Sequence, residues 1–144
     1  WIGASILYCF SSFFKSYLTI INEYYKRLKG RGISLSYYSD KNKSIDYENM
    51  LLNLKGNLIL IDENGEELSS KDLSLLISKI IMDHTTTNFA LGPPDGFSEG
   101  FKSKIHQSIS LSPMTFPHEM AASIFIEQLY RATEIIKGTT YHRE

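Results

Sequence analysis

The sequence predicts an α/β domain built on a mainly parallel sheet that is flanked by helices. First, short and almost wholly apolar runs recur along the chain, and the clearest of them spans Asn57 to Asp62. A strand that is apolar throughout is typical of a sheet covered on both faces, which is how parallel sheets occur. Second, amphipathic segments with apolar residues three and four positions apart separate these runs. An alternation of strands with helices favours the α/β class.

Apolar runs, helical periodicity and glycines define the expected elements of the first half of the chain. In order, they are a strand at about Ile2 to Leu7, a helix from about Ser12 to Lys29, a strand from Ile33 to Tyr38, a polar loop from Lys41 to Asn49 and a short helix from Met50 to Leu54. Gly30 and Gly32 end the first helix, because glycine is a poor helix former. Glu23 and Arg27 lie four residues apart in that helix and can pair on one face.

Capping residues and prolines mark the elements of the second half. In order, they are a strand from Asn57 to Asp62, a turn from Glu63 to Glu66, a helix capped by Ser69 or Ser70 and running to about Met82, a strand from Asn88 to Leu91, a tight loop from Gly92 to Gly96, a helix from Ser98 to about Gln107, a strand from Ser108 to Leu111 and a long last helix. Pro117 suits the first turn of the last helix, and Gly138 ends it.

Length and composition are those of one globular domain. With 144 residues, of which 42% are hydrophobic, the chain can bury a sizeable core, so we expect residues 1–144 to form a single domain. Cys9 is the only cysteine and cannot form an internal disulfide, which favours a reducing, cytoplasmic setting. The apolar first 21 residues contain Lys15 and several serines and lack the features of a signal peptide, so we expect no membrane span. Because no methionine begins the chain, we expect its true start to lie upstream.

Charge is unevenly distributed, although the formal net charge is only -1. Residues 1–45 carry seven Lys and Arg against two acids, a net of +5, whereas residues 46–98 carry nine acids against three lysines, a net of -6. A basic segment on a nearly neutral protein suits a polyanionic partner. Lys26, Arg27 and Lys29 are the candidate contacts, and the alternative is an ordinary solvated helix surface.

Three loops are expected at the carboxyl ends of the strands, where α/β sheets bind ligands. They follow Ile61, Leu91 and Leu111. The loop from Gly92 to Gly96 contains two glycines and two prolines, and it is either a ligand loop or simply a turn. The loop from Ser112 to His118 offers Met114 and Phe116 as surfaces for a flat ring, and its alternative is a connection that lines the core.

The chain closes with Tyr141-His142-Arg143-Glu144. An aromatic ring, an imidazole and a guanidinium group can all stack on bases or contact phosphate. Taken alone, these residues are as well explained by a solvated tail, because chain ends usually fray.

Several motifs occur together at fixed spacing. They are Leu58-Ile59-Leu60-Ile61-Asp62, the loop from Gly92 to Gly96, Ser108 to His118 with its Leu-Ser-x-Met-Thr-Phe-Pro-His core, Glu127-Gln128-Leu129-Tyr130-Arg131-Ala132 and Tyr141-His142-Arg143-Glu144. In these motifs residues 57–144 resemble the SPOUT class of knotted methyltransferases, and within it the bacterial pseudouridine N3-methyltransferases of 23S ribosomal RNA. The helix around Glu23 to Leu28 also resembles the first helix of that family.

The resemblance implies a C-terminal trefoil knot, a homodimer and S-adenosylmethionine as the cofactor, with the knot and the cofactor site at about residues 87–144. Carried over position by position, the cofactor contacts are Ile61, Gly92, Leu111, Ser112, Pro113, Met114, Thr115 and Phe116. The chain departs from the family at one point, because Gly92-Pro93 replaces the usual Gly-Gly.

The resemblance also suggests catalytic roles for the tail. Tyr141, His142 and Arg143 of one subunit would complete the partner's pocket, in which Arg143 or Arg131 stabilises a developing imidate oxygen. His142 would accept the N3 proton because imidazoles titrate near neutrality. The basic N-terminal segment with Lys26, Arg27 and Lys29 would then face the RNA of the ribosome.

Two other functions compete with this one. A SPOUT enzyme acting on another RNA, such as transfer RNA, would have the same motifs, and a non-catalytic knotted protein that binds RNA or a nucleotide would retain the fold. A metal site is not expected, because Cys9 and the four histidines show no ligand spacing.

Overall fold

The computed structural model describes residues 5–10, 15–38 and 43–143, and for residues 5–10 it describes the main chain only. The elements, in chain order, are β1 (Ser5–Phe10), α1 (Lys15–Arg27), β2 (Ile33–Tyr38), α2 (Ser44–Leu52), β3 (Asn57–Glu67), α3 (Ser70–Asp83), β4 (Thr87–Leu91), α4 (Glu99–Lys102), β5 (Gln107–Ser110) and α5 (His118–Lys137). The strands form one sheet in the order β2-β1-β4-β3-β5, and all neighbours run parallel. The predicted α/β class is therefore confirmed.

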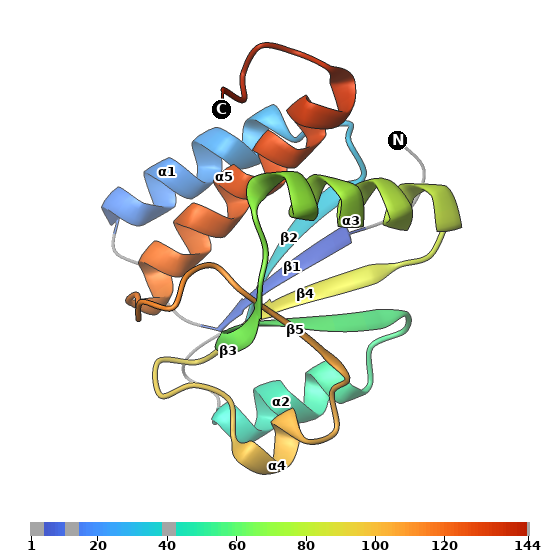
Figure 1. The fold of residues 1–144 in the computed structure, drawn as a ribbon. Coiled ribbons are helices and arrows are strands. Elements are labelled where there is room, and N and C mark those ends of the chain that lie inside the picture. The colour runs from blue at the N-terminus through green and yellow to red at the C-terminus, as the bar shows by residue number, and fades with distance from the viewer. Residues whose placement is uncertain (1–4, 11–14, 39–42, 144) are drawn as a thin grey trace.

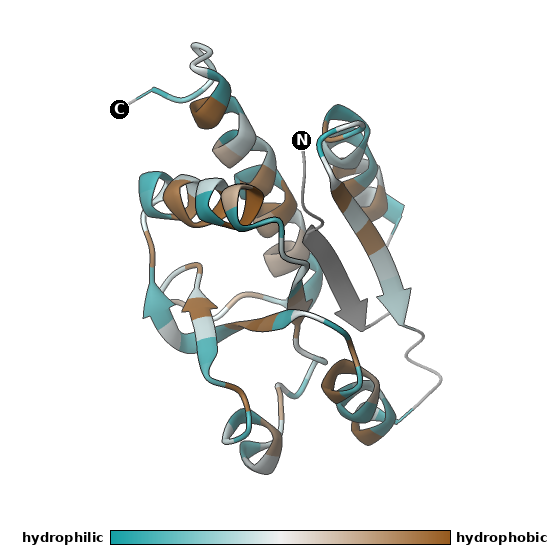
Figure 2. Ribbon diagram, turned by 90° about the vertical axis from the view of Figure 1, so that its right-hand side faces the viewer, coloured by the Kyte–Doolittle hydropathy of each residue, from teal (hydrophilic) through white to brown (hydrophobic). Residues whose placement is uncertain are grey.

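Helices cover both faces of this sheet. Figure 1 shows α1, α3 and α5 on one face and α2 with α4 on the other. Successive side chains of a strand point to opposite faces, so Ile59 and Phe89 pack under the first layer while Leu60 and Ala90 pack under the second. The central strand β4 is buried at every position. In Figure 2 the helices carry both hydrophobic (brown) and hydrophilic (teal) residues, as is typical of amphipathic helices that pack on a core.

Several predicted boundaries are wrong. Helix α2 begins at Ser44, within the expected loop, because its Tyr47 and Leu51 lie one turn apart and are both buried against the sheet. Helix α4 is a single turn and stops at Lys102 rather than reaching Gln107. The first strand is Ser5–Phe10 rather than residues 2–7, and residues 1–4 lie outside the described part of the chain.

Strand β3 continues through the expected turn at residues 63–66. It pairs with β5 twice, first through Ile61 and Ile109 and then, after a shift in register, through Glu66 and the same Ile109. The chain crosses β5 very closely at Gly65, where a β-carbon would lie 2.7 Å from the main chain of Ile109. Only glycine fits this crossing. The trefoil knot stays a prediction.

Two local signals for helix ends, Ser69 and Gly138, were correct. The Ser69 side chain accepts a hydrogen bond from the Asp72 amide, and the Asp72 side chain accepts one from the Ser69 amide, which is a complete capping box. Gly138 ends α5 in the left-handed conformation with φ of 76°. Within the described ranges, no helix is both long and apolar enough to cross a membrane.

Candidate active site

A cleft of about 260 Å³ opens at the carboxyl ends of β4 and β5, beside residues 61–63 of β3. It lies at the carboxyl edge of the sheet, the place where ligands bind in open α/β folds. Ile61 of β3 and Leu91, the last residue of β4, form its floor, and the segments that follow them form two of its walls. His118 and Ala121, at the start of α5, complete the lining.

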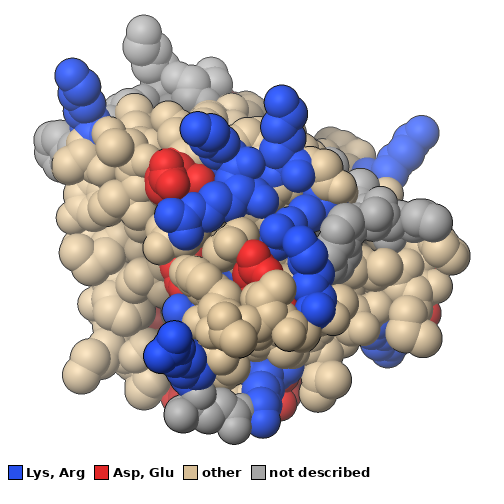
Figure 3. All heavy atoms as spheres, turned by 90° about the horizontal axis from the view of Figure 1, so that it is seen from above, with Lys and Arg blue, Asp and Glu red and all other residues tan. Residues whose placement is uncertain are grey.

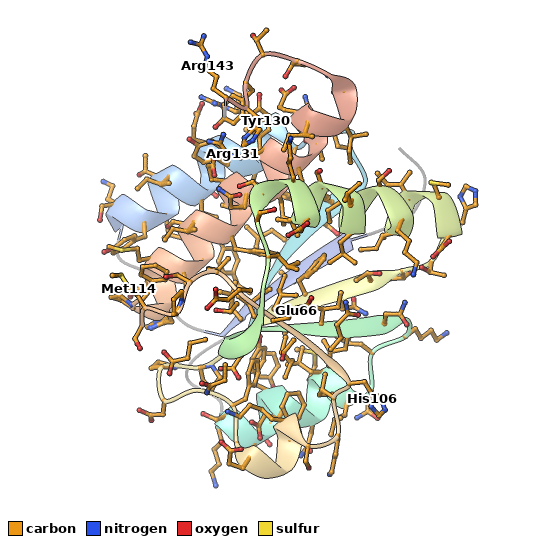
Figure 4. The ribbon with its side chains drawn as sticks, viewed as in Figure 1. Glu66, His106, Met114, Tyr130, Arg131 and Arg143 are labelled. Carbon is orange, nitrogen blue, oxygen red and sulfur yellow. The ribbon has the colours of Figure 1, made fainter. Side chains whose placement is uncertain are left out.

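The residues expected to contact a cofactor come together in this cleft. Seven of the eight line it, namely Ile61, Gly92, Leu111, Ser112, Met114, Thr115 and Phe116. Pro113 belongs to the same loop but is not among the lining residues. Met114, which is labelled in Figure 4, is 72% exposed and lies near the start of α5.

The loop from Gly92 to Phe97 is a tight turn in spite of its two prolines. The Gly96 amide donates a hydrogen bond of 2.7 Å to the Pro93 carbonyl, and Gly96 has a φ of 80°. A β-carbon at position 92 would lie 3.3 Å from the Phe97 ring, so glycine allows the chain to close over that ring. The loop is therefore closed with proline at position 93.

Hydrogen bonds within the third loop shape the opposite wall. The Ser110 hydroxyl donates to the Ser112 carbonyl at 2.8 Å, and the Met114 amide donates to the Ser112 hydroxyl oxygen at 3.0 Å. The Thr115 hydroxyl donates to the Glu63 carboxylate, which joins this loop to the segment that follows the floor of the cleft.

The lining of the cleft is acidic. Asp62, Glu63 and Asp95 all contribute to it, and among the described residues His118 is the one lining side chain that can carry a positive charge. Lys102 lies just outside, 3.6 Å from Asp62, and its pKa is raised by its hydrogen bond to Glu99 and by the Asp62 charge. Such a lining favours a ligand with positive charge.

The C-terminal tail forms a second cluster, anchored on α5 by Glu127. One oxygen of this carboxylate accepts hydrogen bonds from Arg131 at 2.7 and 3.1 Å and from the Tyr141 hydroxyl at 3.0 Å. The Arg131 guanidinium also lies over the Tyr141 ring, 4.9 Å from its centroid, and 3.2 Å from Nδ1 of His142. Arg143 is exposed, and Glu144 lies outside the described residues.

The Tyr141 hydroxyl is a hydrogen-bond donor rather than a base. Burial raises its pKa well above the ordinary value, and hydrogen bonds with Tyr24 and Glu127 raise it further. Both effects favour the protonated phenol. Tyr141 is thus suited to holding the tail in place.

The tail cluster and the basic residues of α1 belong to one surface. Tyr130 packs edge-on against Tyr141 at 4.8 Å and contacts Tyr24 of α1 at 6.0 Å. Arg27 lies over both Tyr24 and Tyr130, at 5.0 and 5.6 Å. Figure 3 shows Lys and Arg side chains gathered on this face of the molecule.

The two clusters lie near opposite ends of α5. His118 begins the helix in the cleft, and Arg131 lies thirteen residues further, which corresponds to roughly 20 Å at 1.5 Å per residue. Figure 4 shows the same separation, with Met114 near one end of the helix and Arg131 and Arg143 near the other. The structure therefore brings Arg131, Tyr141 and His142 together, with Arg27 beside them through Tyr130, but not with the cleft of the same chain.

Some residues of these two sites carry no signal in the sequence. Tyr47 and Glu48 of α2 hold the Gly92–Phe97 loop, although they lie in a segment that looks like a polar loop. Glu127 belongs to a motif of the family, but nothing in its spacing indicates the bond to Tyr141. Among the described residues, no three His, Cys, Asp or Glu side chains are grouped to hold a metal ion.

The fold and the cleft are those of the α/β proteins that bind a ligand at the carboxyl edge of a parallel sheet. Residues 6–142 match the family model described as "Predicted SPOUT methyltransferase", and the chain belongs to this family.

Relatives in several bacteria support the assignment. The chain is 36% identical over 124 residues to the ribosomal RNA large subunit methyltransferase H of Coprothermobacter proteolyticus, covering 85% of this chain and 86% of that protein. The protein of the same name from Bacteroides fragilis is 32% identical over 142 residues, covering 89% of this chain and 90% of that protein.

Among solved structures, the SpoU methyltransferase AviRb of Streptomyces viridochromogenes matches with a TM-score of 0.47 and 12% identity, over 96% of this chain and 62% of that one.

We predict that Glu127→Gln releases the tail. An amide donates as well as accepts, so the substitution weakens the bonds to Arg131 and Tyr141. Hydrogen exchange of the Tyr141 and His142 amides should then accelerate about tenfold, as expected when charge-assisted hydrogen bonds are removed. Glu23→Gln is the matched control, because Glu23 pairs with Arg27 at 3.0 Å with the same i, i+4 spacing. Unchanged exchange in Glu127→Gln would show that the tail is held by other contacts.

Proposed function

We propose that this protein is an S-adenosylmethionine-dependent methyltransferase that modifies N3 of a pseudouridine in 23S ribosomal RNA of the large ribosomal subunit. Membership of the SPOUT family supports methyl transfer, and the names of the relatives support ribosomal RNA as the substrate. The convergence of seven expected cofactor residues on one cleft is the observation that carries the proposal. The enzyme would act in the cytoplasm, where ribosomes are.

The lining of the cleft fits the proposed cofactor. Met114 and Phe116 offer apolar surfaces for the adenine ring, and the loop from Leu111 to Thr115 would supply main-chain groups to its edge. Asp62 and Glu63 complement the positive charges of the methionine part. When bound, S-adenosylmethionine supplies an electrophilic methyl group on a sulfonium ion.

The separation along α5 supports a homodimer. Because Arg131 of the tail cluster lies roughly 20 Å along the helix from the cleft of the same chain, a catalytic tail would have to come from a second copy. A twofold dimer would form two such composite sites, since each subunit both gives and receives a tail.

Arg131 and His142 act together in this proposal. A guanidinium group only donates hydrogen bonds, so Nδ1 of His142 is the acceptor in their 3.2 Å contact. A neutral imidazole has one unprotonated nitrogen, and Arg131 occupies it. When Arg131 turns towards the imidate oxygen of the base, it stabilises the developing negative charge and frees Nδ1 to accept the N3 proton. Arg143, which is exposed beside them, would contact the same oxygen or a phosphate.

The RNA-facing surface would extend from the tail across α1. Lys26, Arg27 and Lys29 are exposed and lie beside the tail cluster, through the contact of Arg27 with Tyr130. Phosphates of a folded RNA could thus bind the basic face while one base enters the composite site.

The proposed reaction predicts one methyl group on one pseudouridine. Purified protein would be incubated with deuterated S-adenosylmethionine and with ribosomes from cells that lack this gene, and the digested RNA analysed by mass spectrometry. We expect the labelled methyl group on the base of a pseudouridine of the large subunit, and none on transfer RNA offered in parallel. Label only on transfer RNA would identify another SPOUT activity, and cofactor binding without any transfer would identify a non-catalytic binding protein.

The RNA-facing surface predicts a salt-dependent effect of charge reversal. The triple variant Lys26→Glu, Arg27→Glu, Lys29→Glu should weaken binding to the ribosome by more than tenfold. The dependence of log K on log salt should flatten by about one for each phosphate that the variant no longer neutralises. Lys55→Glu and Lys79→Glu are suitable controls, since both residues are exposed elsewhere, Lys55 between α2 and β3 and Lys79 on α3. Equal binding by the triple variant and the controls would place the RNA elsewhere.

A further inference from the structure

Two neighbouring residues of α2 bind the two ends of the Gly92–Phe97 loop. The Tyr47 hydroxyl, which is fully buried, donates a hydrogen bond of 2.7 Å to the carbonyl of Leu91, immediately before the loop. Glu48, only 4% exposed, accepts hydrogen bonds from the amide and the hydroxyl of Ser98 at 2.7 and 2.8 Å, immediately after the loop. Both ends of one cleft wall are therefore anchored to a single turn of one helix.

Two packed aromatic rings connect α2 directly to the cleft. The Tyr47 ring stacks on Phe97, with 6.2 Å between centroids and 12° between planes. Phe97 lines the cleft and lies against Gly92 on the other side of the loop. A displacement of α2 would thus move Phe97 and change the width of the turn.

A buried carboxylate such as that of Glu48 needs hydrogen-bond donors, which a hydrophobic core residue does not need. Burying a carboxylate costs free energy unless its oxygens accept hydrogen bonds, and a hydrophobic side chain would serve the core at lower cost. Both oxygens of Glu48 are used on the same residue, Ser98. The Ser98 hydroxyl oxygen in turn accepts from the Phe101 amide at 3.2 Å and caps α4, so one carboxylate orders both the loop exit and the next helix.

We infer that Glu48, together with Tyr47, is a positioning residue that holds the Gly92–Phe97 loop in its ligand-binding conformation before the ligand arrives. The inference rests on the proposed function only for the identity of that ligand. A preformed loop binds more tightly because it loses less conformational freedom on binding. The two prolines further restrict the main-chain conformations of the loop. The hydrogen bonds from α2 then hold the loop in the conformation that lines the cleft.

Glu48→Gln tests this role with nearly unchanged volume. The substituted side chain retains only one acceptor oxygen and loses the negative charge, so Ser98 can no longer donate two charge-assisted hydrogen bonds to it. In the ligand-free protein, hydrogen exchange at the amides of Asp95 to Ser98 should accelerate about tenfold. The dissociation constant for S-adenosylmethionine, measured by calorimetry, should rise by about the same factor, while kcat at saturating cofactor stays within about twofold of the native rate.

Two control variants separate positioning from general loss of stability. Ile80→Val removes one methyl group from the core on α3 and lowers stability without contacting the loop. Glu99→Gln changes an exposed carboxylate of α4 that pairs with Lys102 instead. Both should leave loop exchange and cofactor affinity unchanged, and Ser98→Thr, which retains both donors, should bind the cofactor like the native protein.

The two possible failures are distinguishable. Native exchange rates at Asp95 to Ser98 in Glu48→Gln, or equal loss of affinity in Ile80→Val, would overturn the positioning role. Failure of the native protein to bind S-adenosylmethionine would instead overturn the proposed function, and the exchange measurement on ligand-free protein would still decide the role of Glu48.

Discussion

Helix α5 begins in the cleft at His118 and ends at Gly138, beneath the C-terminal tail. Its length of 20 residues corresponds to about 30 Å, which keeps its two functional ends apart in every conformation in which the helix is intact. Phe125 and Leu129 are fully buried, and Phe125 packs on Phe89 of the central strand at 5.3 Å. At the far end of the helix Arg31 donates a hydrogen bond to Thr133 at 2.7 Å and lies 3.5 Å from Glu134. Thr133 and Glu134 are both buried. The helix is thus fixed to the sheet along its length, and the geometry of the site follows from it.

Charge follows the same division. The cleft at the beginning of α5 has an acidic lining, whereas the face around its end carries the lysines and arginines of α1 and of the tail. An acidic cleft suits a cationic methyl donor, and a basic face suits RNA. In the proposed function, a nearly neutral protein would thus serve two oppositely charged ligands, with the acidic cleft and the basic face meeting across different subunits.

The sequence predicted those parts of the fold that depend on local signals. The apolar run Asn57 to Asp62, the capping serine Ser69 and the terminal Gly138 identified strands and helix ends. The residues that line the cleft were indicated by the resemblance to the SPOUT family. The sequence did not predict contacts between distant segments. Strand β3 continues beyond Gly65 because β5, which follows some forty residues later in the chain, pairs with β3 a second time. Tyr47 and Glu48 look polar and loop-like because their partners, Leu91 and Ser98, lie 44 and 50 residues away.

The central claim is that each catalytic site combines the cleft of one subunit with the tail of another. A variant lacking residues 141–144 and the variant Ala121→Trp, which fills the cleft, would be co-expressed with different tags, and the heterodimer isolated through both. Each variant alone should be inactive on ribosomes. The heterodimer contains one intact composite site, so about half of the native activity should return. An inactive heterodimer made of folded subunits would contradict the claim and show that the tail serves the cleft of its own chain.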